Sequence, residues 1–175
     1  MPSGKVHDQI TIIAAAAITP VWYFFTPPPV NPTVGLTLIA ATLFSGLMLS
    51  PDLDLNSSIY SRWGPFRYLW WPYQKAIPHR SNFSHSYILG TTLRVVYFLA
   101  LAWLLLRGVT WAAAQFFPFD RNGISREATD LVANFWRKHP AHAQMLALGL
   151  FFGPALHCAA DTIVSGLKRK KRRAH

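Results

Sequence analysis

Histidine and aspartate residues that can bind a metal gather next to the apolar segments of this 175-residue chain. The chain has only seven acidic residues, and several of them lie within a few positions of the end of an apolar segment: Asp8, Asp52, Asp54 and Asp161. Histidines accompany them, at His7, His79, His85 and His157. Groups so far apart in sequence rarely converge unless they bind a metal or serve a reaction. We therefore expect them to meet at one site.

His157 and Asp161 are the clearest pair of candidate metal ligands. Their i, i+4 spacing places both side chains on one face of a helix. A buried histidine that is hydrogen-bonded to a carboxylate has the same spacing, so the pair alone does not identify a metal site. The apolar sequence around the pair favours a functional interpretation, because ionisable groups within a membrane segment are costly.

Asp52 and Asp54 directly follow an apolar segment, in the sequence Pro-Asp-Leu-Asp. The helix macrodipole favours cations at a helix C-terminus, so two carboxylates there suggest a cation nearby. On an extended backbone both side chains would project the same way, as two ligands or as one ligand and a general base. The alternative is simple termination of the helix by Pro51 and Asp52.

Two more histidines precede the third apolar segment. His79 and His85 are too poorly spaced for one helix face, so we expect part of this stretch to be a turn. Arg80 is a candidate for holding an anionic substrate oxygen, because a guanidinium group matches phosphate bidentately. The alternative is a polar loop that leads into the helix.

The remaining ionisable residues are weaker candidates for the site. Asp8 ranks below His7, because an acid is favourable in the first turn of a helix without any further role. Arg94, within the third apolar segment, either extends to the membrane surface or pairs with a site carboxylate. The acids Asp120, Glu127 and Asp130 are expected to be solvated.

Four apolar segments must position these residues, at 10–25, 34–50, 87–106 and 143–167. A helix needs about 20 apolar residues to cross a bilayer. Only 14% of the chain is charged, which is low for a soluble domain. We therefore expect an all-α integral-membrane bundle of about four helices, with one domain over 1–167 and a basic tail at 168–175. The alternative, a soluble helical bundle, must bury long uncharged runs in a small domain and is disfavoured.

Helices that cross in alternating directions would bring every candidate ligand to one membrane face. That face carries most of the 17 Lys and Arg residues, largely through the tail. The positive-inside rule then places this face, with both termini, in the cytoplasm of a bacterial inner membrane. The first segment is expected to be retained rather than cleaved as a signal peptide, because Pro20 and large aromatic residues stand where a small-residue cleavage site would be.

Two further segments have the composition of interfacial helices. The stretch 60–73 mixes aromatic residues with Arg62 and Arg67, as expected at the level of lipid headgroups. A second helix, capped by Ser125, is expected to run to about Lys138. The basic tail would be drawn to anionic membrane lipid, and this partner is favoured over nucleic acid beside a membrane span.

Several motifs spread along the chain belong to one pattern. They are Pro-Ser-Gly-Lys-Val-His-Asp at 2–8, Gly-Leu-Met-Leu-Ser-Pro-Asp-Leu-Asp at 46–54, Arg-Trp-Gly at 62–64, Pro-His-Arg-Ser at 78–81, Ser-His-Ser at 84–86 and His-x-x-x-Asp at 157–161. Together they resemble a family of uncharacterised bacterial metal-binding membrane proteins, over nearly the whole chain.

That family is similar to the YdjM-like, LexA-regulated membrane-bound metal-dependent hydrolases, which share P-D-[LI]-D, H-R-G-x-T-H-S and H-x-x-x-D blocks. Here Ser81 and Ser84 replace the Gly and Thr of those blocks, and Leu55 replaces a histidine that often follows the second Asp. The order of histidines and acids is also loosely similar to that of zinc-dependent phospholipase C. The resemblance implies metal binding more directly than it implies a reaction.

We expect a membrane-bound metal-dependent hydrolase that acts on a phosphoester or lipid substrate at the cytoplasmic face. The expected ligands are His7, Asp52, His79, His85, His157 and Asp161. This mixed nitrogen and oxygen set suits zinc, with manganese or iron as alternatives. A water activated by the cation would be the nucleophile, with Asp54 as its general base and Arg80 holding the substrate anion.

A non-enzymatic membrane protein that senses, stores or transports the metal would use the same ligands. A purely structural zinc site is the least favoured interpretation, because the candidates outnumber the four ligands that such a site uses.

Overall fold

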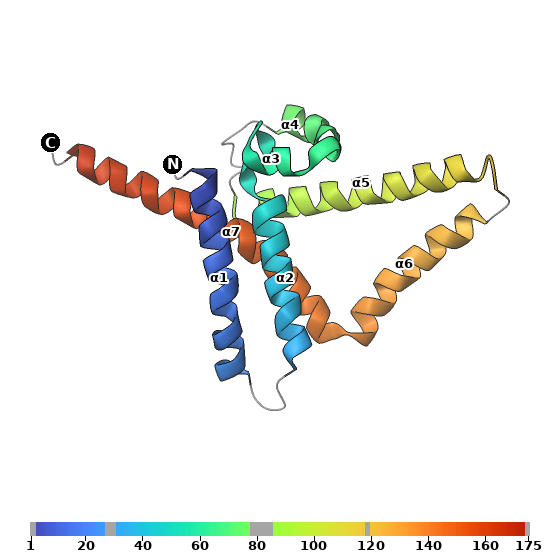
Figure 1. Ribbon diagram of the computed structural model, residues 1–175, viewed down its shortest axis with the longest axis horizontal. Helices are drawn as coiled ribbons and strands as arrows, with labels where there is room; N and C mark the ends of the chain where they lie inside the picture. The colour runs from blue at the N-terminus through green and yellow to red at the C-terminus, as the bar shows by residue number, and fades with distance from the viewer. Residues whose placement is uncertain (1–2, 27–30, 78–85, 118–119, 174–175) are drawn as a thin grey trace.

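The computed structural model describes residues 3–26, 31–77, 86–117 and 120–173, and all regular secondary structure in these ranges is helical. The elements are α1 (Gly4–Phe25), α2 (Pro32–Met48), the 3₁₀ helix η1 (Pro51–Asp54), α3 (Ser58–Arg62), the 3₁₀ helix η2 (Gly64–Trp70), α4 (Trp71–Ala76), α5 (Leu89–Ala113), α6 (Arg121–Lys138) and α7 (Pro140–Arg173) (Figure 1). Helices α1, α2, α5 and α7 are long and apolar enough to cross a membrane. The expected all-α fold with four such segments is confirmed.

Three of the four long helices form the core of the molecule. Helices α1 and α2 run antiparallel side by side, and α7 packs along α2 and reaches α1 (Figure 1). Helix α5 begins at the end of the core where α2 ends, but it extends away from the core. Helix α6 then leads back from the far end of α5 to the start of α7 (Figure 1). The apolar residues of α5 are spread around the helix, so no single face directs it onto the other three.

Glycine residues allow α2 and α7 to approach within backbone contact. A Cβ atom on Gly149 would lie 2.8 Å from the carbonyl oxygen of Leu38, and one on Gly153 would lie 2.5 Å from the amide nitrogen of Gly46. The Ser45 hydroxyl crosses the interface and donates to the Gly149 carbonyl at 2.8 Å. Small residues and short polar contacts of this kind are typical of helices that associate in membranes.

The close contact continues directly into the candidate site. Gly149, Gly153, His157 and Asp161 follow one another at intervals of four residues, so they lie along one face of α7. The two glycines set the distance between α7 and α2, and the next two positions carry the candidate ligands. The packing of the helices therefore fixes where the ligands point.

Helix α1 presents a matching row of buried residues, His7, Thr11 and Ala15. Its contact with α2 is equally close, because a Cβ atom on Gly46 would lie 2.5 Å from the methyl carbon of Thr11. The Thr11 hydroxyl donates to the His7 carbonyl at 3.0 Å. His7 is therefore held at the same end of the molecule as the last turn of α2.

A small aromatic subdomain formed by α3, η2 and α4 covers this end of the molecule. Its buried core joins α3, η2 and α4 to η1 and the end of α2. The core consists of Leu49, Leu53, Ile59, Tyr60, Trp70 and Tyr73. The Tyr97 hydroxyl of α5 donates to the Leu69 carbonyl at 2.6 Å. The stretch predicted to be interfacial is thus a packed subdomain, with Phe66, Tyr68 and Trp71 on its exposed side.

The Arg-Trp-Gly motif closes the C-terminus of α2. Arg62 donates to the Leu47 carbonyl at 2.9 Å, and the Trp63 indole nitrogen donates to the Met48 carbonyl at 3.1 Å. These side chains satisfy carbonyl groups that have no partner within the helix, and Arg62 places a cation where the macrodipole favours one. Gly64 has φ +53°, a left-handed conformation that glycine adopts without steric cost.

The N-cap of α6 is Asp120, so the prediction that Ser125 caps this helix is wrong. The Asp120 carboxylate accepts from the Asn122 amide at 2.9 Å. Hydrogen bonds from the amides of Gly123 and Asn122 hold the pKa of the Asp120 carboxyl below its usual value. Ser125 is buried one turn further along and accepts from Arg107 of α5 at 2.9 Å. An aspartate cap therefore starts the helix earlier than the serine that sequence suggested.

The glycine contacts predict opposite effects for two alanine substitutions in α7. Gly153→Ala should reduce the free energy of unfolding by about 1–3 kcal/mol, because the new methyl group meets the Ser45 side chain and the α2 backbone. Gly166→Ala, where no atom lies within 4 Å of the added Cβ, should leave stability unchanged or raise it by up to about 1 kcal/mol. Thermal unfolding in detergent measures both, and equal effects would contradict the close contact.

Candidate metal centre

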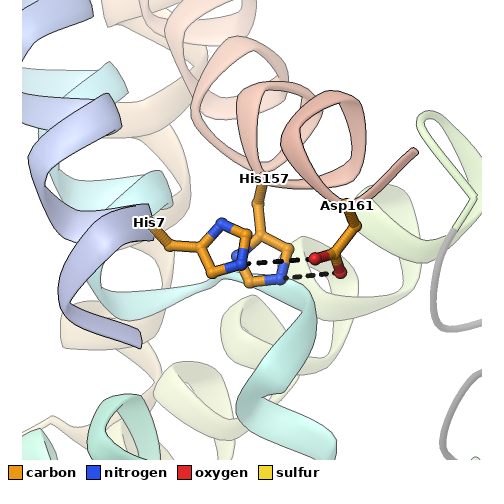
Figure 2. Close-up of side chains that lie close together, drawn as sticks. All are labelled: His7, His157 and Asp161. Atoms are coloured by element: carbon orange, nitrogen blue, oxygen red, sulfur yellow. Dashed lines mark ion pairs between the residues drawn. The ribbon is translucent and has the colours of Figure 1, made fainter. Parts of the chain in front are cut away.

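His7, His157 and Asp161 converge at one end of the three-helix core (Figure 2). His7 lies in the first turns of α1, and the other two lie on successive turns of α7. One nitrogen or carboxylate oxygen from each residue lies within 4.8 Å of the corresponding atoms of the other two. All three side chains are buried. The prediction that these distant residues meet at one end of the helices is confirmed for this group.

The two imidazole rings direct the same nitrogen at one carboxylate. The rings of His7 and His157 are stacked, with centroids 3.7 Å apart and planes at 17°. Nε2 of His7 lies 3.4 Å from Oδ1 of Asp161, and Nε2 of His157 lies 3.6 Å from Oδ2 (Figure 2). A neutral imidazole nitrogen is the donor that binds a metal.

Asp52 adds a second carboxylate on the more open side of the group. The 3₁₀ helix η1 places Oδ1 of Asp52 3.5 Å from Nε2 of His157. The Asp52 side chain is 23% exposed, whereas that of His157 is 3% exposed. The centre therefore combines two imidazole nitrogens with two carboxylates, and one of the carboxylates has access to solvent.

The distances between these atoms are compatible with a bound cation. Separations of 3.4–3.6 Å exceed the usual length of a nitrogen–oxygen hydrogen bond, about 2.7–3.2 Å. Ligand atoms about 2.1 Å from a tetrahedral zinc ion lie about 3.4 Å from one another. The nitrogen and oxygen donors are also those that zinc prefers. The residues present therefore fit a divalent metal.

Ser50 is part of the site, although sequence analysis did not identify it. Its buried hydroxyl lies 2.8 Å from Nδ1 of His157. When Nδ1 carries the proton it donates to Ser50, and the Nε2 lone pair then faces the two carboxylates. Partners of this kind fix the tautomer and orientation of metal-binding histidines. The only signal in the sequence is that Ser50 directly precedes the Pro-Asp-Leu-Asp motif.

Asp52 and Asp54 do not project the same way, because the extended backbone that this would require is not formed. Residues 51–54 form a 3₁₀ helix, in which positions two apart point in different directions. Asp54 is buried and interacts electrostatically with Arg94 of α5 and Tyr73 of α4. Burial raises the pKa of the Tyr73 hydroxyl.

Arg94 is fully buried rather than extended to the membrane surface. It interacts electrostatically with Tyr73, Cys158 and Asp54, and thus connects α5 to α4, α7 and η1. The two carboxylates at the end of α2 suggested a cation nearby. For Asp54 this cation is the guanidinium of Arg94. Asp54 interacts electrostatically with Arg94, whereas Asp52 lies beside His157.

The other candidate residues have different positions. Asp8 forms an ion pair with Arg62 of α3, which ties α1 to the aromatic subdomain and separates Asp8 from the centre. His79, Arg80 and His85 lie outside the described residues, so their predicted roles stay predictions.

The fold and the site together define a class of protein: an all-helical chain with four helices able to span a membrane and a buried His/His/Asp group able to hold a metal. The chain belongs to the family described as "Uncharacterized metal-binding protein (DUF2227)", which matches residues 2–171. Comparisons with curated proteins and with solved structures found no match. The expected membership of an uncharacterised metal-binding family is confirmed.

The ligand set predicts how metal content responds to histidine substitution. His157→Ala should remove most of the bound metal, because it deletes the nitrogen that faces both carboxylates. His142→Ala is the matched control, since His142 contacts Thr33 at the start of α2, away from the centre. Elemental analysis of the proteins purified in detergent measures the effect. Equal metal content in the two variants would contradict the assigned centre.

The hydrogen bond from Ser50 predicts a smaller effect on the same measurement. Ser50→Ala should weaken metal affinity about 10- to 100-fold, as observed when outer partners of metal-binding histidines are lost. Ser61→Ala, an exposed serine of α3, should leave the affinity unchanged. Titration against a competing chelator measures both affinities. An unchanged affinity in Ser50→Ala would show that the hydroxyl does not orient His157.

Proposed function

We propose that this protein is a membrane-embedded, zinc-dependent hydrolase of phosphoester substrates. The observation that carries the proposal is the convergence of two histidine nitrogens and two carboxylates, one of them partly exposed, at one end of the apolar helices. A closed structural site has no need of a solvent-accessible acid beside its ligands. Membership of a metal-binding family supports the metal itself.

The proposed roles of the residues in the centre differ according to how deeply each residue is buried. His7, His157 and Asp161 are buried and would hold the cation, and Ser50 would keep His157 in the required tautomer. When bound, the cation lowers the pKa of a coordinated water toward about 7 and polarises a substrate oxygen. Asp52, as the accessible carboxylate beside His157, would complete the ligand set or accept a proton from the water.

Four other residues keep the roles proposed for them from the sequence. Asp54 is a second candidate for the general base, and its interaction with Arg94 gives it a competing role in holding η1. Arg80, outside the described residues, is proposed to hold the substrate anion. His79 and His85 are proposed as further ligands. The site would then have the ligand and base positions of the YdjM-like membrane-bound hydrolases, to which we propose that this family is related.

The proposed activity takes place at a membrane. Four apolar helices of suitable length support insertion in a membrane, proposed to be the bacterial inner membrane with both termini in the cytoplasm. The exposed aromatic residues of the subdomain and the basic tail support contact with anionic lipid headgroups. Membrane lipid, rather than nucleic acid, is the proposed partner.

A metal-binding role without catalysis is the second candidate function. The observation that favours it is the burial of His7, His157 and Asp161, which are only 3–6% exposed. Sensing or storage of a metal requires a tight, enclosed site and no route for a substrate. Exposure of Asp52 is the feature that separates the two functions, because a site for sensing or storage gains nothing from it.

Hydrolysis of bis(p-nitrophenyl) phosphate by the purified protein tests the proposed activity. Zinc-loaded protein should turn over this substrate, chelator-treated protein should not, and added zinc should restore the rate. Asp52→Asn should reduce turnover by at least about 100-fold if Asp52 transfers the proton. Full metal binding with no turnover of any phosphoester would favour the second candidate function.

Asp54→Asn tests the competing general base separately. Loss of turnover with full metal content would assign the proton transfer to Asp54. Turnover equal to that of the unsubstituted protein would exclude Asp54 as the base and leave it as a partner of Arg94.

A further inference from the structure

Two apolar cavities follow one another along α1 and α7, and the nearer one lies beside the metal centre. The near cavity, about 550 Å³, is lined by Val6 and Ile10 of α1 and by α7 residues that include Leu156, Ala160 and Ile163. A second cavity of about 590 Å³ follows farther from the centre, between the same two helices and α2. We call the two cavities together the α1–α7 groove.

The groove and the metal centre share the same helical turns. Val6, Leu156 and Ala160 line the near cavity, and each directly precedes one of the ligands His7, His157 and Asp161. Successive residues of a helix are rotated by about 100°. The ligands therefore point into the helix interface while their preceding neighbours face the groove. A molecule in the near cavity lies one side-chain layer from the centre.

The lining of the near cavity selects for hydrocarbon. All of its lining side chains are valine, isoleucine, leucine or alanine. They offer no hydrogen-bond partner to a sugar, a base or a peptide backbone, whereas they match the surface of an alkyl chain. Lys5, in the same turn of α1 as Val6, is exposed.

The length of the groove matches a membrane. The α1 residues that line it run from Val6 to Thr26, which is about 30 Å at 1.5 Å per residue. That length equals the thickness of the hydrocarbon core of a bilayer, about 30 Å. The near cavity, at Val6 and Ile10 of α1, lies within the half of that length on the side of the centre. A lipid of the leaflet on that side would have its head at the level of the ligands.

We propose that the near part of the α1–α7 groove binds an acyl chain of a glycerophospholipid and presents the phosphoester head to the metal centre. Glycerophospholipid is then the substrate class, an assignment that rests on the proposed hydrolase function. In the reaction the oxygen of water bonds to phosphorus and one phosphorus–oxygen ester bond breaks. A proton from the water passes to the departing ester oxygen, so atoms and charges balance.

Photolabelling tests chain binding independently of catalysis. The full-length, zinc-loaded protein is reconstituted in phosphatidylglycerol vesicles that contain an analogue with a diazirine in its acyl chain. Label should be enriched at 6–10 and 156–163 relative to the exposed residues of α5, and Ile163→Trp should reduce it several-fold. Leu104→Trp is the matched control, because Leu104 on α5 and Ile163 are 65% and 62% exposed. Equal labelling of α5 and the groove would overturn the proposal.

Turnover of two substrates tests the substrate class. Ile163→Trp and, as a second variant, Ala160→Phe should lower the ratio of phosphatidylglycerol hydrolysis to bis(p-nitrophenyl) phosphate hydrolysis, whereas Leu104→Trp should not. Hydrolysis of the chain-free substrate without hydrolysis of phosphatidylglycerol would overturn the substrate class and leave the hydrolase function standing. Labelling of the groove without turnover of either substrate would support chain binding and overturn the hydrolase function. Cross-linking of the groove to a second copy of the chain would overturn chain binding.

Discussion

The site depends on the close contact between α2 and α7. Gly149 and Gly153 remove the side chains that would hold the two helices apart, and Ser45 bonds across the gap that remains. Because the next two positions of the same row are His157 and Asp161, a small change in helix separation moves the ligands directly. In a membrane, lipid would provide no hydrophobic force to press helices together, so this fit and the few polar contacts would determine the geometry. The centre is thus set by the shape of small residues rather than by strong interactions among the ligands.

Charged and polar groups are concentrated at one end of the core, and each has a specific partner there. Arg62 pairs with Asp8 and caps α2, Arg94 interacts with Asp54, and Ser50 contacts His157. Ionisable groups among apolar helices are costly unless they are satisfied in this way. The aromatic subdomain contributes by covering the end of α2 and supplying Arg62. The metal centre is therefore one part of a larger polar layer between the apolar helices and the subdomain.

The sequence predicted the helices and the meeting of His7, Asp52, His157 and Asp161, because apolar length and i, i+4 spacing are local properties. It did not predict that Asp52 and Asp54 diverge, since extended and 3₁₀ backbones are equally compatible with Pro-Asp-Leu-Asp. Ser50 was missed, and the two alternatives for Arg94 were left open, because both depend on contacts between helices. The cap of α6 was misplaced because Asp120 and Ser125 are both good N-cap residues. The departure of α5 from the core also follows from tertiary packing, which its evenly apolar surface does not specify.

The ligands come from the first and the last of the long helices, α1 and α7, with α2 and η1 between them. During synthesis His7 leaves the ribosome long before His157 and Asp161, so the centre cannot form until α7 has been made. A cation that then joins the two ends closes the chain into a ring about 150 residues long, and such long-range links restrict the unfolded state strongly. A metal that binds this centre can therefore do so only after α7 has been made, and a chain truncated before α7 would lack two of the ligands.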